Sequence, residues 1–397
     1  MIETGQMGLY FHWPFCLSKC PYCDFNTHIR ENVDRQRWLD AYKCAMDFYA
    51  EKLPHRIISS IFFGGGTPSL MPPQTIGEII AHAQKLWPQV NDLEVTLEAN
   101  PTSVEAEKFA AFADAGVNRV SIGVQALNDN DLKFLGRQHD VKAARRAIDI
   151  ACKNFPRYSF DLIYARPGQT LESWKNELDE AFDLSGGHLS LYQLTIERNT
   201  PFYFAHAQKR FAMPEEDLAA DFYHLTQEAT SKAGLPAYEV SNHAAEDHQS
   251  RHNMNYWRYG DYIGIGPGAH GRLTLEDGVK YATREHQSPD IWLEWVGEKG
   301  SGAHPFTPLS RAERFNECLM MGLRMSEGLN FVRLEEQGAC RWQERINEER
   351  LKTLQAEGWL SYDDERIILN AEGLLRLNAI LPYILLEAGE GGAKSAA

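Results

Sequence analysis

The feature that most constrains the fold of this chain is an alternation of short apolar strands and amphipathic helices over its first 200 residues. Predicted strands cover 8–13, 57–63, 93–99, 119–125, 158–164 and 188–197. Helices are expected between them, for example over 34–53 and 171–184, where apolar residues recur every three or four positions. Six strands that alternate with helices predict an α/β fold, a parallel sheet wrapped by crossovers.

Polar and glycine residues stand where these strands end. They comprise the cysteine-containing loop after the first strand, Gly64–Thr67, Glu98, Gln125, Asp161 and the stretch from Gln193 to Glu197. In α/β barrels, ligands bind at the carboxyl ends of the strands. Six successive strand ends therefore predict one shared pocket.

A cysteine motif follows the first strand, with Cys16, Cys20 and Cys23 at the spacing Cys-x3-Cys-x2-Cys. Iron–sulfur clusters are held by cysteine thiolates. Three thiolates would hold three irons of a four-iron cluster and leave the fourth iron open to a small molecule. A zinc site completed by His12 or His28 is an alternative. A disulfide framework is disfavoured, because seven cysteines in 397 residues are sparse and odd in number.

Each polar side chain of the predicted pocket has more than one interpretation. The Gly64–Gly66 triplet allows close approach of backbone to a ligand, although such a stretch can also be a simple turn. It is no P-loop, because no Gly-Lys-Ser/Thr follows. Glu98 could accept a hydrogen bond from a ribose hydroxyl or an ammonium, or lie on the surface. Gln125 and Asp161 could be structural. Arg137 could bind a carboxylate bidentately or pair with a neighbouring acid.

The rest of the chain has a different character. Residues 201–304 include a predicted helix over 218–232 and a stretch rich in Tyr, His, Asn and Gly. Residues 305–387 are predicted to be mainly helical, with helices over 342–357 and 371–386 and a small hairpin near 358–369. This arrangement resembles a winged helix. The Gly/Ala-rich tail 388–397 is expected to be frayed.

The net charge and the hydropathy of the chain limit which partners and which cellular locations we expect for it. The net charge is −15 without a dense Lys/Arg patch, which argues against nucleic-acid binding. We therefore interpret the C-terminal module as a packing or partner module. No apolar run approaches the roughly 20 residues that span a bilayer, and the N-terminus resembles neither a signal nor a transit peptide. A cytoplasmic protein is predicted.

The cysteine motif with Tyr22 before its last cysteine, followed by the glycine triplet on the next strand, resembles the radical S-adenosylmethionine (SAM) superfamily. The resemblance implies a partial (β/α)6 barrel whose three cysteines hold a [4Fe–4S] cluster. It also implies that the amine and carboxylate of SAM chelate the open iron. One electron from the cluster then cleaves the sulfonium and yields a 5′-deoxyadenosyl radical.

Further motifs are similar to those of the oxygen-independent coproporphyrinogen dehydrogenases. These are Tyr10, Gly64–Pro68, Glu98, Gly123–Gln125, Arg137 and Asp161. By this resemblance Tyr10, Gly65 and Glu98 would contact the cluster-bound SAM. A neighbouring second site would be lined by Tyr22, Gly66, Thr67, Gln125, Arg137 and Asp161.

Two local features resemble instead the HemW family of haem chaperones. Phe25 stands two places after Cys23, where the dehydrogenases carry a further cysteine, and His252 to Trp257 form a His-Asn-x-x-Tyr-Trp motif. This resemblance implies haem binding, an electron donor for the cluster, and delivery of haem to membrane haemoproteins such as respiratory cytochromes. Peripheral contact with the inner membrane would follow. The alternative is a coproporphyrinogen III dehydrogenase, and the resemblance leaves open whether the chain is an enzyme.

Three other positions carry expectations of their own. His252 is the candidate haem ligand, since histidine is a usual axial ligand, with a satisfied core histidine as the alternative; His270 is a second candidate. The stretch Ala165–Gly168 has Ala-Arg-Pro-Gly where many relatives have Gly-Leu-Pro-Asp/Gly, and we expect it to alter that edge of the pocket. Cys152 and Cys318 fall on apolar helix faces and are predicted to be core thiols.

Overall fold

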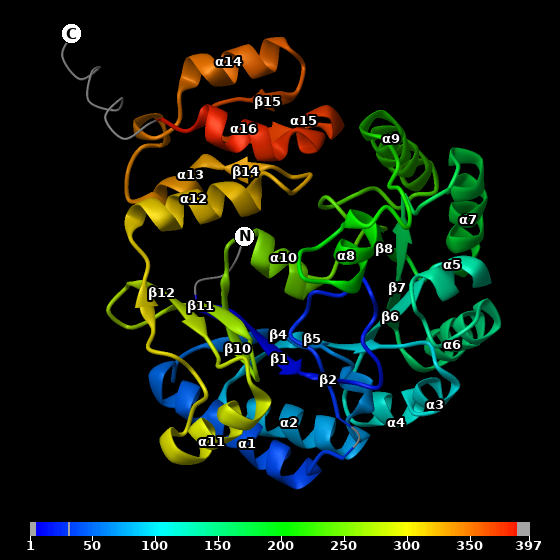
Figure 1. The fold of residues 1–397 in the computed structure, drawn as a ribbon. Helices are drawn as coiled ribbons and strands as arrows, with labels where there is room; N and C mark the ends of the chain where they lie inside the picture. Colours follow the sequence, from blue (N-terminus) through cyan, green and yellow to red (C-terminus); the bar gives the residue numbers. More distant parts are fainter. Residues whose placement is uncertain (1–4, 31, 387–397) are drawn as a thin grey trace.

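The computed structural model describes residues 5–30 and 32–386, and Figure 1 shows its central sheet with helices packed around it. The predicted tail 388–397 lies outside the described residues. Six parallel strands form the middle of the sheet: β1 (Gln6–Trp13), β4 (Ile57–Gly65), β5 (Gln89–Ala99), β6 (Arg119–Gln125), β7 (Arg157–Tyr164) and β8 (His188–Gln193). Their order follows the chain, which confirms the predicted partial (β/α)6 arrangement.

Helices connect these strands and bury one apolar face each. They are α1 (Arg35–Lys52), α2 (Pro73–Leu86), α3 (Ser103–Ala106), α4 (Phe109–Asp114), α5 (Asp129–Phe134), α6 (Val141–Asn154) and α7 (Leu171–Leu184). Short elements lie beside the first two strands, namely β2 (Phe15–Cys16), β3 (His28–Ile29) and the 3-10 turn η1 (Pro68–Leu70). Because side chains alternate across a strand, Leu9 and Phe11 of β1 face the buried core with α1, while Tyr10 and His12 point to the opposite, barrel side.

Residues 201–304 extend the same sheet on both sides. Their strands are β9 (Asn242–Ala244), β10 (Asp261–Ile265), β11 (His270–Thr274) and β12 (Lys280–Arg284), and their helices α8 (Pro201–Ala207), α9 (Glu216–Lys232), α10 (Arg251–Trp257) and α11 (Pro289–Lys299). β10 pairs in parallel with β1, and β9 pairs antiparallel with β8. The boundaries at 200 and 304 remain predictions.

The C-terminal module has an apolar core of its own. Its elements are β13 (Thr307–Pro308), which pairs with β12, then α12 (Arg311–Gly322), β14 (Leu329–Asn330), α13 (Phe331–Gly338), η2 (Trp342–Glu344), α14 (Glu348–Ala356), β15 (Leu360–Tyr362), β16 (Arg366–Leu369), α15 (Ala371–Leu375) and α16 (Leu377–Ile384). A three-stranded sheet in the order β14-β16-β15 accompanies the helices. The predicted helical module with a hairpin is therefore present.

Three predicted elements differ in extent from the structure. The sixth strand ends at Gln193 and not at Glu197, because its partner strand β7 ends at Tyr164 and the next residue, Ala165, has left-handed backbone. The helix expected over 342–357 is the turn η2 followed by α14, which Asn347 caps. The last helix, expected over 371–386, is divided into α15 and α16 at Arg376.

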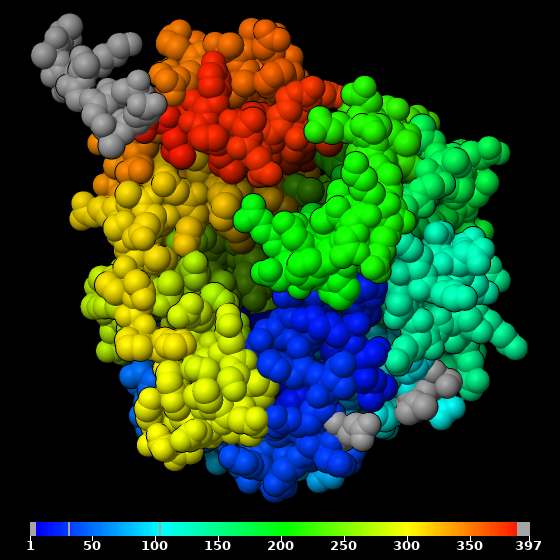
Figure 2. All heavy atoms as spheres, viewed as in Figure 1, coloured from blue at the N-terminus to red at the C-terminus, as the bar shows by residue number. Residues whose placement is uncertain are grey.

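Among the described residues, no helix combines the length and apolar character that crossing a bilayer requires. Figure 2 shows that one face of the molecule is hollowed between the N-terminal segment in blue, the segment around α8 in green and the C-terminal module in orange and red.

Candidate functional site

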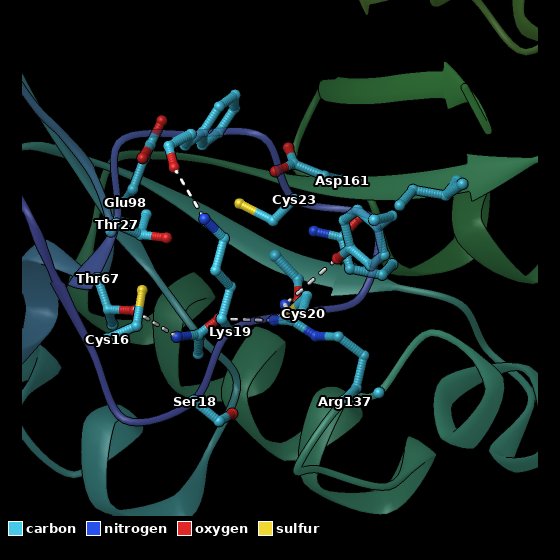
Figure 3. Close-up of a pocket in the computed structure, with 18 of the residues that line it drawn as sticks. Cys16, Ser18, Lys19, Cys20, Cys23, Thr27, Thr67, Glu98, Arg137 and Asp161 are labelled. Carbon is cyan, nitrogen blue, oxygen red and sulfur yellow. Dashed lines mark hydrogen bonds between the residues drawn. The ribbon is translucent and has the colours of Figure 1, made fainter. Parts of the chain in front are cut away.

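One pocket of about 400 Å³ brings the carboxyl ends of the parallel strands together with the cysteine loop. Figure 3 shows its wall from close by. Most of the residues predicted for the site line it, namely Cys16, Cys20, Tyr22, Cys23, Gly65, Gly66, Thr67, Glu98, Gln125, Arg137 and Asp161. Two predicted residues, Tyr10 and His252, lie outside its lining. The clustering of strand ends that the sequence indicated is thus present, while the role of each residue remains a prediction.

The three cysteine thiols are free and half-buried along this wall. A tight turn shapes the loop, because the Cys23 N–H donates to the Cys20 carbonyl at 3.1 Å. The Thr67 hydroxyl lies 3.5 Å from Cys16 Sγ, and Arg137 Nη1 lies 3.3 Å from Cys20 Sγ. Burial raises the pKa of the Cys16 and Cys23 thiols. Donors that face two of the sulfurs suit thiolates, which carry negative charge.

The thiols have the chemistry of an iron–sulfur ligand set, since hydrogen-bond donors lie beside two of the three sulfurs. Within the part of the chain that the structure describes, no group of three His, Cys, Asp or Glu side chains is arranged to hold a metal ion. The two histidines that could complete a zinc site have other partners. His12 lies 3.0 Å from both the Tyr10 hydroxyl and the Asn26 carbonyl, and His28 lies 3.3 Å from Asn26 Oδ1.

The glycine triplet lies directly against the cysteine loop, where side chains would collide. A Cβ on Gly65, which has φ +113°, would lie 2.7 Å from the His12 ring, and one on Gly66 would lie 2.7 Å from the Phe15 carbonyl oxygen. The Gly66 and Thr67 N–H groups donate to the carbonyls of Trp13 and Phe15 at 2.6 and 2.9 Å. This packing requires glycine and presents bare backbone to the pocket.

Two half-buried carboxyl groups make the pocket suited to a cation. The pKa of Glu98 is raised to about 8, chiefly by burial and then by the charge of Asp161. Burial also raises the pKa of Asp161 to about 6. Glu98 Oε2 accepts one hydrogen bond, from the Gly65 N–H at 3.2 Å. A positively charged ligand beside these groups, such as the sulfonium and ammonium of SAM, would favour their ionised forms.

Arg137 joins the cysteine loop to the strand ends. Its Nη2 donates to Asn100 Oδ1 at 2.6 Å and to the Gly123 carbonyl at 2.8 Å, while Nη1 lies 3.4 Å from the Tyr22 hydroxyl. Asn100 also donates to Thr67 Oγ1 at 3.1 Å.

Asn100 and Tyr192 are among the residues of this wall for which the sequence predicted no role. Asn100 follows Glu98 in the strand-end motif Glu-Ala-Asn-Pro, and that position was the available signal. Tyr192 lines the pocket from β8 and had no signal beyond strand alternation.

His252 lies in the barrel interior, on α10, away from the pocket. Its side chain is 1% exposed, and burial lowers its pKa to about 3. Nδ1 lies 2.7 Å from the Ser60 hydroxyl and Nε2 lies 3.2 Å from the Tyr256 hydroxyl. The ring also stacks against Phe62 at 5.0 Å between centroids. Both ring nitrogens therefore have partners in this conformation, whereas His270, the second candidate, is exposed.

Tyr10 connects the pocket wall to this interior site. Its hydroxyl bonds to His12, and its ring stacks against His252 at 6.4 Å between centroids. A Cβ on Gly64 would lie 2.9 Å from the Tyr10 ring and 3.2 Å from Glu98 Oε2. Tyr10 thus stands directly behind the wall that Glu98 and the glycine triplet form.

Comparison with known proteins gives two family matches along the chain. Residues 10–181 match the radical SAM superfamily, and residues 309–376 match the HemN C-terminal domain. Together the two matches include the cysteine loop, the first five parallel strands and most of the C-terminal module.

Curated relatives resemble the chain over nearly its whole length. The radical SAM domain-containing protein 1, mitochondrial, of Danio rerio is 38% identical over 96% of this chain and 87% of that protein. The haem chaperone HemW of Escherichia coli is 34% identical over 98% of this chain and 100% of that protein. The solved structure of coproporphyrinogen III oxidase (HemN) from Escherichia coli, described as a radical SAM enzyme, covers 95% of this chain and 89% of its own, with a TM-score of 0.77 at 22% identity. At that identity it supports the fold alone.

Proposed function

This chain belongs to the HemN-like branch of the radical SAM superfamily, and we propose that it is a haem chaperone of the HemW type. It would bind a [4Fe–4S] cluster, SAM and haem, and deliver haem to membrane haemoproteins such as respiratory cytochromes. One observation favours a haem chaperone over a coproporphyrinogen III dehydrogenase. Phe25, 58% exposed, lines the pocket two residues after Cys23, where the dehydrogenases have a further cysteine.

Different residues of the pocket would bind the cluster and SAM. Cys16, Cys20 and Cys23 would hold the cluster through their thiolates. The bare backbone at Gly65 and the carboxyl of Glu98 would receive SAM and balance its positive charge. When bound, the cluster and SAM supply one-electron chemistry, for which an electron-donor protein would be required.

The haem ligand is the part of the proposal that concerns the two histidines. The His252 ring is enclosed by its neighbours. A haem iron could bind one of its nitrogens only if the hydrogen bond to the Ser60 or Tyr256 hydroxyl were broken. Such a change requires the His252 side chain to leave one of these two contacts. His270 is exposed and needs no rearrangement. We keep His252 as the proposed ligand because it lies in the motif that resembles the HemW family, and His270 as the alternative.

Haem titration of matched variants tests this assignment. His252→Ala should lower haem affinity and alter the Soret band, while His270→Ala and the exposed control His55→Ala should behave as the parent. Loss of the band in His270→Ala alone would move the ligand to β11. Parental binding in all three would contradict both candidates.

Delivery is tested by transfer of haem to an apo-cytochrome in vesicles. The haem-loaded protein should restore the cytochrome spectrum faster than free haem at the same concentration, and flotation should show peripheral binding to these vesicles. Transfer no faster than that from free haem would contradict the chaperone function.

A cytoplasmic location at the inner membrane remains part of the proposal, and fractionation of cells tests it.

A further inference from the structure

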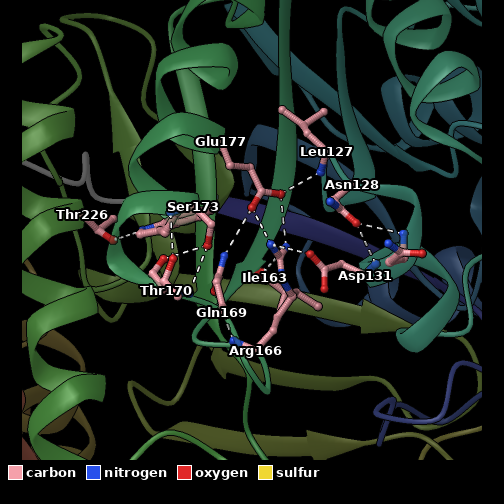
Figure 4. A network of polar contacts seen from close by, with 12 residues as sticks. Leu127, Asn128, Asp131, Ile163, Arg166, Gln169, Thr170, Ser173, Glu177 and Thr226 are labelled. Carbon is pink, nitrogen blue, oxygen red and sulfur yellow. Dashed lines mark hydrogen bonds and ion pairs between the residues drawn. The ribbon is translucent and has the colours of Figure 1, made fainter.

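A buried ion network lies behind the pocket, at the position where Ala165–Gly168 departs from the family pattern. Arg166 is 2% exposed. Its Nη1 donates to Glu177 Oε1 at 3.1 Å and to the Ile163 carbonyl at 3.0 Å. Its Nη2 lies 2.5 Å from Glu177 Oε2 and 3.1 Å from Asp131 Oδ2. Figure 4 shows the guanidinium between the two carboxylates.

The network connects the segments that follow two neighbouring strands, β6 and β7. Glu177, on α7, also accepts from the Leu127 N–H at 2.7 Å, just beyond β6. Asp131 belongs to α5, and Arg166 follows β7. Two residues beside these anchors have left-handed backbone, Gln125 at φ 72° and Ala165 at φ 55°. A non-glycine residue adopts that conformation only where its surroundings hold it there.

The anchored segment leads directly to the cysteine loop. The Arg137 N–H donates to the Leu132 carbonyl at 2.9 Å, which joins Arg137 to α5. Leu132 and Leu135 are buried in an apolar cluster with Ile163 of β7. Residues 126–137 therefore form one packed piece, bound to Arg166 at one end and reaching Cys20 through Arg137 Nη1 at 3.3 Å at the other.

We infer that Arg166 is a positioning residue: with Glu177 and Asp131, it holds residues 126–137 so that the Arg137 guanidinium faces Cys20. The planar fork of arginine can bond two carboxylates and a carbonyl at once. A cation at Cys20 favours the more negative, reduced state of a cluster held there. The inference rests on the cluster of the proposed function and is independent of haem.

Asp131→Asn is the sharpest variant, because it weakens the link to α5 and leaves the Arg166–Glu177 pair in place. The matched control is Asp179→Asn, which weakens an exposed ion pair on α7. Arg166→Leu should have the larger effect, but it leaves Glu177 buried without its cation and can unfold the protein. If Arg166→Leu does not fold, Asp131→Asn still tests whether the network positions Arg137.

Two measurements report whether the Arg137 side chain is still held beside Cys20. Amide hydrogen exchange of the full chain should be about tenfold faster over residues 126–137 in Asp131→Asn than in the control, because local opening there no longer has to break the ionic contact between Asp131 and the buried Arg166 guanidinium. In the reconstituted protein, the reduction potential of the cluster should shift to more negative values, in the same direction as in Arg137→Gln. The control should match the parent in both measurements.

The outcomes separate this inference from the proposed function. Unchanged exchange in Asp131→Asn would overturn the role of the network. Faster exchange with an unchanged potential, while Arg137→Gln shifts it, would overturn the link to Cys20. A protein that binds no haem yet shows both effects would contradict the chaperone function and leave the positioning role intact.

Discussion

At the residue scale, the two half-buried carboxyl groups of the pocket determine how its stability responds to pH. Glu98 has a pKa of about 8 in the folded protein against an ordinary value of 4.5. Between these values the folded state keeps a proton that the unfolded state has released. The free energy of unfolding therefore falls as pH rises from about 4.5 to about 8, by up to about 1.4 kcal/mol per pH unit from this group.

Replacement of Glu98 by glutamine should remove that dependence. Glu98→Gln should gain stability relative to the parent as pH rises through this window, because the amide has no proton to lose. Urea unfolding at pH 5 and pH 8 of both proteins, without SAM, measures the difference. An equal offset between the two proteins at both pH values would mean that Glu98 does not hold its proton in the fold.

Gly66 should tolerate no side chain, for a steric reason. An alanine Cβ would lie 2.7 Å from the Phe15 carbonyl oxygen and would force the cysteine loop away from β4. We expect Gly66→Ala to lose about 1–3 kcal/mol of unfolding free energy and most of its iron–sulfur absorption after anaerobic reconstitution. Gly297→Ala, where nothing lies within 4 Å of the new Cβ, is the control and should match or slightly exceed the parent. Equal iron content in both variants would contradict the packing argument.

Which residues lie together in the pocket could be predicted from the sequence where the motif is short and local. The cysteine loop, the glycine triplet and the strand-end residues depend on neighbours in sequence, and they lie in one pocket. Burial was harder to predict. Cys318 is buried as expected, but Cys152, predicted to be a core thiol, is exposed, so that prediction was wrong. Helical periodicity alone does not show how far a helix face extends beneath its neighbours.

At the scale of elements, α10 links the barrel to the C-terminal module. His252 at its start packs beneath Tyr10 of β1, while Trp257 at its end lies under the Arg324 guanidinium. Tyr259, just beyond the helix, is buried in the core of the C-terminal module. The motif that resembles the HemW family thus has structural contacts with two parts of the molecule.

The contact at Glu317 should contribute measurably to this junction. Glu317, on α12, accepts hydrogen bonds from Arg272 of β11 at 2.8 and 2.9 Å and from the Tyr259 hydroxyl at 2.6 Å. Glu317→Gln should lower the free energy of unfolding by about 1–3 kcal/mol. Asp179→Asn, in an exposed ion pair, should change it by less than about 0.5 kcal/mol. Urea unfolding compares the two, and equal effects would show that the junction does not depend on this carboxylate.

Elements between the two predicted units could not be predicted from local pattern. β9 to β12 have three to five residues each, too few for a periodic signal. β10 joins the sheet by pairing with β1, about 250 residues away in the chain. Such pairing depends on tertiary context and not on the composition of the strand.

At the scale of the whole molecule, the sequence predicted the fold because each of the six β/α units carries its own signal. The order of strands follows from short connections that keep successive strands adjacent. The site followed in turn, since parallel strands bring their carboxyl ends to one edge. The haem site did not follow, because it depends on whether an enclosed histidine becomes accessible.

One reconstituted sample tests the central claim most directly, by haem titration combined with a dehydrogenase assay. We predict that the protein with its cluster and SAM binds haem at one site and yields no protoporphyrinogen from coproporphyrinogen III under reducing conditions. Formation of protoporphyrinogen, with release of two carboxyl groups as carbon dioxide, together with no saturable haem binding, would contradict the account and identify a dehydrogenase.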